Sequence, residues 1–240
     1  MIEIINLKRS FGKTEVLKGI TLNAKPGQVT GLLGPNGAGK TTTIKILSTI
    51  LRPHSGDVKI QGISIKESPE KVRKHLGVVF EESGIYRRLT GIENILYFAR
   101  LADVSTEEAK KRMINLFDLL AVDYAHKLAG TYSKGMMQKI NLIRSVIHNP
   151  PVVVLDEPTN GLDVPSTRAV ETFIKEMKEE GKTILLSTHL MTQVEKLCDY
   201  IYIIHKGQIV EQGTPDDIKE KYQTNTVEDA FLKVVNGYVE

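Results

Sequence analysis

One stretch of the sequence reads Gly34-Pro35-Asn36-Gly37-Ala38-Gly39-Lys40-Thr41-Thr42 and matches the pattern G-x-x-x-x-G-K-[ST]. The apolar segment Val29–Leu33, of strand length, precedes it, and Thr41–Leu51 has a helical pattern. A strand, a glycine-rich loop and a helix in this order are the setting in which such a loop binds phosphate. The pattern arises by chance in roughly one chain of this length in a hundred, and the matching setting makes chance a poorer explanation.

A triphosphate carries several negative charges and therefore needs many hydrogen-bond donors at close range. Glycines let backbone N–H groups converge without a Cβ in the way. The start of the following helix adds unpaired N–H groups and a favourable dipole. We expect Lys40 to reach the β- and γ-phosphates and the Thr41 hydroxyl to ligate Mg²⁺.

A second segment, Val152–Leu155, has the length and composition of a buried strand and leads into Asp156 and Glu157, followed by Pro158. Ligands of a parallel sheet sit at the carboxyl ends of its strands. Asp156 can there hold Mg²⁺ through water, and Glu157 can orient or deprotonate an attacking water. Two acids after a strand can also mark a solvated turn, but the upstream phosphate loop favours the functional interpretation.

The rest of the chain predicts an α/β fold. About the first seventy residues are β-rich, and residues 90–148 have a helical pattern. Strand and helix signals then alternate, which is typical of a mainly parallel sheet covered by helices. One helical stripe is expected to face the core: Ala109, Met113, Leu116, Phe117 and Leu120. The alternating segments are Val152–Leu155, Ser166–Glu179, Thr183–Ser187, Met191–Leu197, Tyr200–His205 and, last, the helical Val227–Val235.

Composition excludes several classes of protein. A net charge of +3 gives no support for a nucleic-acid partner. The single cysteine, Cys198, rules out an intrachain disulfide, and its apolar neighbours predict a buried, inert thiol. The sequence has no window of about 18 apolar residues and no basic-then-apolar start, so we expect neither a membrane span nor a signal peptide.

Further segments resemble motifs of one family and occur in that family's order. Together with the two segments above, they make the sequence similar to the ATP-binding cassette (ABC) ATPases over essentially its whole length. They are Phe11 in Arg9-Ser10-Phe11-Gly12, Glu81 after Gly77-Val78-Val79-Phe80, Tyr132-Ser133-Lys134-Gly135-Met136, Asn160-Gly161-Leu162-Asp163 and Ser187-Thr188-His189.

The resemblance implies a fold more specific than α/β. It implies a P-loop NTPase (RecA-like) core with a mainly parallel sheet, an N-terminal antiparallel β-subdomain and an inserted helical subdomain. The whole chain, 1–240, would be one cassette domain. Residues 1–82 and 151–220 would form the nucleotide-binding core, 83–150 the helical subdomain and 221–240 a C-terminal tail.

The resemblance also implies roles for particular residues. Residues 34–42 would bind ATP and Phe11 would stack on adenine, unless Phe11 is simply a core residue. Ser133 and Gly135 would contact the γ-phosphate of ATP held by a second cassette, although Ser133 can also be a plain N-cap. The expected Mg²⁺ ligands are Thr41, Glu81 and Asp156, and the expected catalytic residues are Lys40, Glu157 and His189. His189 can alternatively be an ordinary helix-start residue.

Two departures from the family pattern stand out. Glu81 occupies a position that is usually glutamine, so it keeps an oxygen ligand, loses an amide donor and gains charge. The segment Tyr132–Met136 differs from the usual Leu-Ser-Gly-Gly-Gln at Lys134 and Met136. Such variants are similar to the branch of cassettes linked to drug, sodium or polysaccharide export.

The expected function is therefore that of an ATPase subunit, peripheral on the cytoplasmic face of the cell membrane. It would pair with a second, like or unlike, cassette and drive an integral membrane permease on a separate chain, in the direction of export. The permease is expected to dock on Gly84–Leu89, unless that segment is an ordinary surface loop. The alternative is a soluble ATP-switched interaction protein without a transport partner. A P-loop kinase or GTPase is a poorer match, because base-reading and switch motifs are missing.

Overall fold

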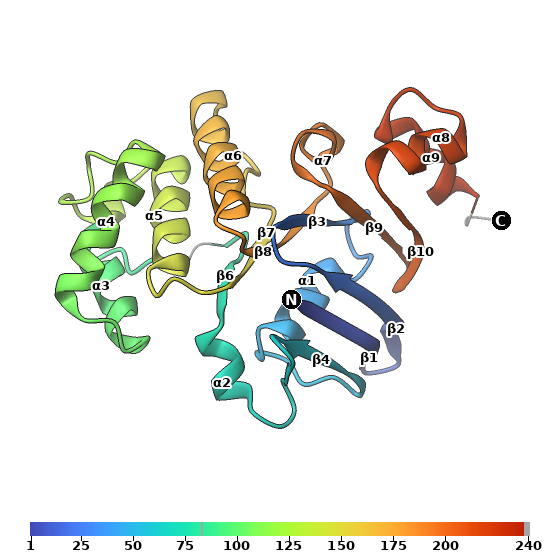
Figure 1. The fold of residues 1–240 in the computed structure, drawn as a ribbon, viewed down its shortest axis with the longest axis horizontal. Helices are drawn as coiled ribbons and strands as arrows, with labels where there is room; N and C mark the ends of the chain where they lie inside the picture. Colours follow the sequence, from blue (N-terminus) through green and yellow to red (C-terminus); the bar gives the residue numbers. More distant parts are fainter. Residues whose placement is uncertain (83, 238–240) are drawn as a thin grey trace.

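The computed structural model describes residues 1–82 and 84–237. In this part of the chain the strands form two sheets (Figure 1). The smaller sheet is antiparallel, with the order β2-β1-β4-β5. Its strands are β1 (Ile2–Phe11), β2 (Thr14–Ala24), β4 (Ser55–Ile60) and β5 (Ile63–Ser64).

The larger sheet has the order β10-β9-β3-β8-β7-β6 and is parallel except for β10. Its register aligns the ends of three strands, because Leu33 pairs with Thr188 and Asp156 pairs with Ser187. The phosphate loop and the two acids therefore emerge at the same edge. The strands are β3 (Gln28–Leu33), β6 (Leu76–Val79), β7 (Val152–Asp156), β8 (Thr183–Thr188), β9 (Tyr200–His205) and β10 (Gln208–Gly213).

Helices cover both faces of the larger sheet. The first, α1 (Lys40–Leu47), lies between the two sheets, where Ile44 and Leu47 pack with residues of both. The opposite face is covered by α6 (Val164–Glu179) and α7 (Met191–Leu197) (Figure 1). Burial of apolar side chains on both faces drives this layered arrangement. Three further helices lie outside the helical layer described next: α2 (Pro69–Lys74), α8 (Pro215–Tyr222) and α9 (Val227–Asn236).

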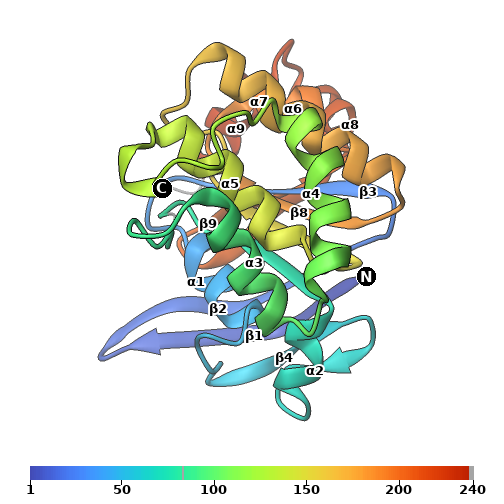
Figure 2. The same ribbon diagram turned by 90° about the vertical axis from the view of Figure 1, so that its left-hand side faces the viewer.

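A helical layer stands at one end of the molecule and faces the viewer in Figure 2. It contains α3 (Gly91–Leu101), α4 (Thr106–Leu120), the 3₁₀ turn η1 (Ala129–Thr131) and α5 (Lys134–Val146). The start of α3 is set by a capping box, in which Thr90 and Glu93 bond each other's backbone N–H groups. The predicted stripe on α4 is buried at Ala109, Met113, Leu116 and Leu120, whereas Phe117 is half-buried.

The predicted α/β class and RecA-like layering are confirmed, with corrections at element boundaries. The helix after the phosphate loop ends at Leu47 rather than Leu51, because Thr49 adopts a left-handed φ of 64° and the chain turns back. The first strand, β1, ends at Phe11 and pairs with β2 through irregularities in register. Cys198 is buried, and burial raises the pKa of its thiol to about 12, as expected for an inert cysteine.

The division of the chain at residues 82 and 150 stays a prediction, although α3 to α5 all lie between those positions. The predicted tail, 221–240, includes α9, which packs on α7 and α8. Residues 238–240 of that tail lie outside the described residues. Among the helices of residues 1–82 and 84–237, none has the length and apolar character needed to span a membrane.

Candidate functional site

The loop between β3 and α1 requires glycine at specific positions. Gly37 and Gly39 have positive φ values of 80° and 115°. A Cβ on Gly34 would stand 2.3 Å from the carbonyl oxygen of Ile204, on the neighbouring strand β9. The stretch 34–39 is thus a tight backbone cradle, with Lys40 and Thr41 at the beginning of α1.

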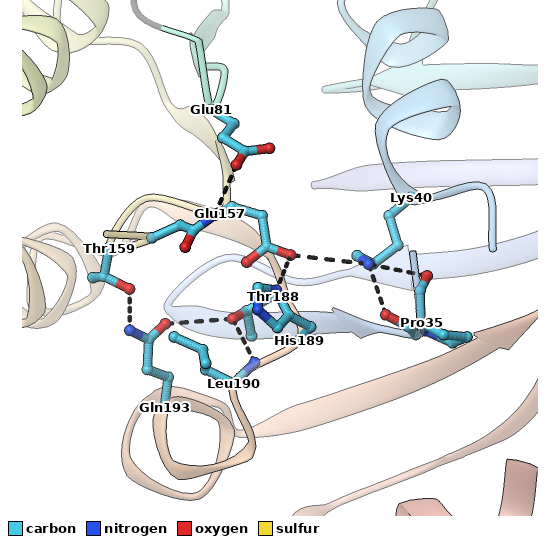
Figure 3. A network of polar contacts seen from close by, with 11 residues as sticks. Pro35, Lys40, Glu81, Glu157, Thr159, Thr188, His189, Leu190 and Gln193 are labelled. Carbon is cyan, nitrogen blue, oxygen red and sulfur yellow. Dashed lines mark hydrogen bonds and ion pairs between the residues drawn. The ribbon is translucent and has the colours of Figure 1, made fainter. Parts of the chain in front are cut away.

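Lys40 lies inside this cradle and is only 6% exposed. Its Nζ donates to the carbonyl oxygens of Gly34 at 2.6 Å and Pro35 at 3.3 Å (Figure 3). Burial lowers the pKa of the ammonium, and the negative charges of Glu157, Asp156 and Glu81 oppose that shift. The loop therefore holds a desolvated cation where a phosphate would be bound.

The two predicted acids lie beside that cation. Asp156 is 2% exposed and Glu157 is 8% exposed. Oδ1 of Asp156 and Oε2 of Glu157 have no hydrogen-bond partner among the described residues. Burial raises the pKa of Asp156, while the neighbouring Ser187 and Thr41 hydroxyls act in the opposite direction. Buried carboxylate oxygens without partners are costly, so they point to a ligand of this site.

Glu157 connects the acid pair to His189 and Lys40. Its Oε1 is 2.9 Å from Nδ1 of His189 and 3.9 Å from Nζ of Lys40 (Figure 3). Glu157 adopts a positive φ of 49°, and its backbone N–H donates to the Ser187 carbonyl oxygen at 2.9 Å. A side chain held in this strained backbone region is a frequent feature of functional sites.

The donor set fits Mg²⁺ carried by a triphosphate rather than a metal held by protein alone. No cluster of three or more His, Cys, Asp or Glu residues suited to a metal occurs in the described part of the chain. Mg²⁺ commonly takes one or two protein ligands and completes its shell with phosphate oxygens and water. Thr41 beside the unpartnered Oδ1 of Asp156 meets that requirement.

Glu81 takes a different position from the other predicted metal ligands. Its Oε1 accepts a hydrogen bond from Nδ2 of Asn160 at 2.7 Å (Figure 3). Its charge reaches Lys40, since it is among the groups that oppose the fall in the pKa of that lysine. Glu81 is thus close to the site, and its role as a Mg²⁺ ligand stays a prediction.

Sequence reasoning missed a buried polar network behind His189. The Gln193 side-chain amide donates to Oγ1 of Thr159, and its Oε1 accepts from Oγ1 of Thr188 at 3.5 Å. Oγ1 of Thr188 accepts in turn from the Leu190 backbone N–H at 3.0 Å (Figure 3). Gln193 lies on α7 outside every motif, so no sequence signal identifies it. The network ties the segment around His189 to the loop after Glu157.

Phe11 and Ser133 lie apart from this cluster. Phe11 is 44% exposed, with the Arg9 guanidinium 4.8 Å from its ring centroid, so it is not a core residue. Ser133 is the N-cap of α5 and accepts from the Met136 backbone N–H at 3.2 Å. No hydrogen bond or ion pair within residues 1–82 and 84–237 joins Ser133 to residues 34–42.

Gly135, in the first turn of α5, lies where that helix packs closely against α6. A Cβ on Gly135 would stand 2.7 Å from Oγ of Ser166, so a larger residue would push α5 away from α6. The glycine therefore has a packing role, and a contact from Gly135 to nucleotide stays a prediction.

The sequence is similar to known ATP-binding proteins of ABC transporters. The family model described as ABC transporter matches residues 17–160. The ABC transporter ATP-binding protein NatA of Bacillus subtilis (strain 168) is 36% identical over 244 residues, covering 99% of each chain. The daunorubicin/doxorubicin resistance ATP-binding protein DrrA of Streptomyces peucetius is 34% identical over 227 residues, covering 94% of this chain and 69% of its own length.

Two solved structures extend the comparison to the fold. An ATP-binding subunit of an ABC transporter superposes with a TM-score of 0.91 at 29% identity, covering 98% of this chain and 99% of the other. A dimeric post-hydrolysis state of the ATP-binding cassette MJ0796, bound to ADP and Pi, superposes with a TM-score of 0.78 at 26% identity, covering 89% and 98%. Because the family match includes the glycine loop and both acids, and the likeness runs along almost the whole fold, the chain belongs to the ABC transporter family as one of its ATP-binding subunits.

Proposed function

We propose that this chain hydrolyses ATP with Mg²⁺ and thereby drives a separate integral membrane permease in the direction of export. One observation carries the proposal: a carboxylate oxygen of Glu157 lies 2.9 Å from His189 and 3.9 Å from Lys40, next to the buried Asp156. Hydrolysis of a phosphoanhydride needs a cation on the phosphates and a base for water, and this cluster supplies both.

Each residue has a distinct part in the proposed reaction. Lys40 exchanges its carbonyl partners for phosphate oxygens. Thr41 and Asp156 would hold Mg²⁺, with Glu81 nearby, and a bound metal would neutralise phosphate charge. Glu157 accepts the proton of the attacking water on its unpartnered Oε2, while His189 keeps the other oxygen oriented.

A second cassette completes the proposed site. The helix start at Ser133 has unpaired N–H groups suited to an anion, but it makes no polar contact with the phosphate loop within the described chain. Ser133 and Gly135 would therefore reach ATP held by another cassette, and Phe11 would stack on adenine within one. The cassette MJ0796 has been solved as a dimer, which supports this arrangement.

The permease is proposed to dock on the helical layer. Tyr86 and Tyr97 are 48% and 44% exposed, and their ring centroids are 5.4 Å apart in an edge-to-face contact. Beside them lies a cavity of about 760 Å³ lined in part by Phe80, Phe98 and Leu101. An exposed cluster of aromatic side chains next to an apolar cavity is typical of a protein interaction site. Tyr86 of this surface belongs to the segment 84–89 predicted from the sequence, where an ordinary loop is the alternative.

Export is the direction that the relatives favour, since DrrA is described as a resistance protein. The chain would then be peripheral at the cytoplasmic face of the membrane. The alternative, an ATP-switched interaction protein without a permease, would leave the aromatic surface for a different partner. Fractionation of native cells separates the two, because only the transporter subunit is retained on membranes by an integral protein.

Replacing Lys40 tests the proposed chemistry. Lys40→Ala removes the cation from the loop, so we expect ATP affinity to fall by at least about a hundredfold, as for loss of a buried charge-assisted contact. Lys45→Ala, on the exposed face of the same helix, is the matched control and is expected to keep affinity and turnover. Binding by calorimetry and phosphate release by the Lys40→Ala chain at wild-type levels would reject the site.

A further inference from the structure

Two of the positions that depart from the common family pattern, Glu81 and Lys134, line the same cavity. Glu81 follows β6, and Lys134 is the first residue of α5. Both line an open cavity of about 410 Å³, together with Glu82 and Gln138. Glu81 and Lys134, which are distant in the sequence and each depart from the family pattern, thus line one cavity.

Each of these residues also contacts one of two consecutive residues in the loop after Glu157. Glu81 accepts the hydrogen bond from the Asn160 side chain at 2.7 Å. Lys134 lies over Gly161, because a Cβ built on Gly161 would stand 2.6 Å from its Nζ and within 3.6 Å of its Cε and Cδ. Gly161 has a φ of 69°, a backbone conformation that favours glycine, and the Lys134 side chain crosses the turn at this residue.

Charge favours this arrangement. Lys134 makes no ion pair within 4.0 Å in the described chain, and the acidic groups on the cavity wall are Glu81 and Glu82. Opposite charges at such separations attract modestly at a protein surface and are screened by salt. The Asn160–Gly161 turn thus lies between Glu81, after β6, and Lys134, at the start of α5.

The Asn160–Gly161 turn is also hydrogen-bonded to the backbone of Glu157. The Asn160 backbone N–H donates to the Glu157 carbonyl oxygen at 3.2 Å, and Glu157 has the strained φ of 49°. A shift of the turn moves this backbone and with it the carboxylate that contacts His189. We propose that Lys134 is a positioning residue for hydrolysis, acting with Glu81 through the Asn160–Gly161 turn on Glu157. The proposal rests on the ATP hydrolysis proposed above.

The contacts predict which kinetic constant changes. Within the described chain Lys134 and Glu81 contact the turn and make no hydrogen bond or ion pair with the glycine loop, so loss of Lys134 is expected to misplace Glu157 without removing a contact to the ATP held by the same chain. At saturating Mg²⁺ we expect Lys134→Met to lower kcat by about two- to fivefold, the range of a partly exposed charge contact, with KM for ATP nearly unchanged. Lys134→Arg keeps the charge and restores most of kcat.

A double-mutant cycle on the full-length chain tests the partnership. Lys134→Met is expected to lower kcat less when residue 81 is already Gln than in the wild-type chain. The chain that carries both Glu81→Lys and Lys134→Glu is expected to have a higher kcat than the chain with either charge reversal alone. Raising the salt concentration from about 50 to about 300 mM is expected to reduce the difference in kcat between the wild-type and Lys134→Met chains, because salt screens an exposed charge contact. Lys74→Met, at an exposed lysine 3.0 Å from Asp103, is the control and leaves kcat unchanged.

Gly161→Ala provides a second test, since its Cβ displaces the lysine side chain. We expect it to lower kcat in the wild-type chain and to have a smaller effect in the Lys134→Met chain. Independent, multiplying effects in both cycles, or a Lys134→Met chain with wild-type kcat, would overturn the proposal. A wild-type chain that hydrolyses ATP but shows such independence rejects only this inference, whereas a wild-type chain without ATP hydrolysis rejects the proposed function.

Discussion

Individual residues at this site carry charges that the free protein stabilises poorly. The pKa of Asp156 is raised by burial and that of Lys40 is lowered by burial, so both charged forms are disfavoured relative to water. A bound Mg²⁺-triphosphate would supply the opposite charges that the fold leaves out. Function is thereby placed ahead of stability at these positions.

Asp156→Asn is expected to stabilise the nucleotide-free chain while abolishing hydrolysis. Since burial raises the pKa of Asp156 in the folded state above its ordinary value of 3.8, the unfolded state loses its proton first and stability falls as pH rises through this window. Above this window the cost is fully present, and the substitution removes it. Each kcal/mol recovered raises Tm by roughly 2–4 °C in a domain of this size.

Thermal unfolding at pH 7.5 and at progressively lower pH measures this effect, and the gain is expected to shrink on acidification. Asp163→Asn is the matched control with the opposite sign. Hydrogen bonds from Ser166 lower the pKa of Asp163, so its carboxylate stabilises the start of α6 at neutral pH. A lower Tm for Asp156→Asn than for the wild type at pH 7.5 would contradict the argument.

Glu81→Gln is expected to preserve hydrolysis, within about fivefold of wild type, and to raise the Mg²⁺ concentration needed for half-maximal rate. The substitution removes a negative charge close to the site but keeps an oxygen that can accept from Asn160. A Mg²⁺ titration of the steady-state rate measures this. Complete loss of ATPase would show that the carboxylate is indispensable, contrary to this view.

Among the elements, α5 connects three parts of the molecule. Its N-cap is Ser133, its Gln138 side chain donates to the Pro158 carbonyl oxygen at 2.9 Å, and its Arg144 donates to the Gly84 carbonyl oxygen at 2.7 Å. Arg144 also stacks on Phe98, 4.3 Å from the ring centroid. One rigid helix therefore joins the proposed second-cassette contact, the loop after Glu157 and the proposed docking segment.

The segment before α3 provides a test at this scale. Tyr86→Asp with Leu89→Asp places charge in the aromatic surface, so we expect loss of the co-purifying integral membrane protein while ATPase in solution survives. Leu232→Asp, at an apolar residue of α9 that is as exposed as Tyr86, is the control and is expected to retain the partner. Unchanged co-purification of the double variant would exclude docking at this segment.

The whole molecule has its site at one edge of the larger sheet, where the proposed second cassette, like or unlike, would pack against it. Glu157→Gln removes the proposed base but keeps the shape, so ATP should bind and persist. We expect this chain to dimerise with Mg²⁺ and ATP, and to turn over at least about a hundredfold more slowly than wild type. Light scattering after gel filtration measures the mass.

The control for that experiment is Glu171→Gln, a substitution of a buried glutamate on α6 that pairs with Lys196. It is expected to turn over ATP and to show no lasting dimer. A Glu157→Gln chain that stays monomeric with ATP and also fails to close in its transporter complex would reject the proposed sandwich of two ATP molecules.

Local rules explain why so much of this protein could be predicted from sequence. The glycine pattern at 34–39 and the apolar strand ending at Asp156 depend on backbone stereochemistry and on side-chain alternation, which short segments express by themselves. The α/β class, the phosphate loop and the acid pair were therefore accessible. The ends of helices and strands were harder to predict. Thr49, for example, turns the chain within a stretch that has helical composition.

Tertiary structure alone decided which distant residues meet. Strand order in the larger sheet brings Glu157, His189 and Lys40 to one point, and no local pattern encodes that order. The same holds for Gln193 behind His189 and for Lys134 over Gly161. Phe11 is exposed only because of where its strand ends in the smaller sheet. Contacts between segments depend on the packing of whole layers, so their geometry follows from the fold and not from the neighbours in sequence.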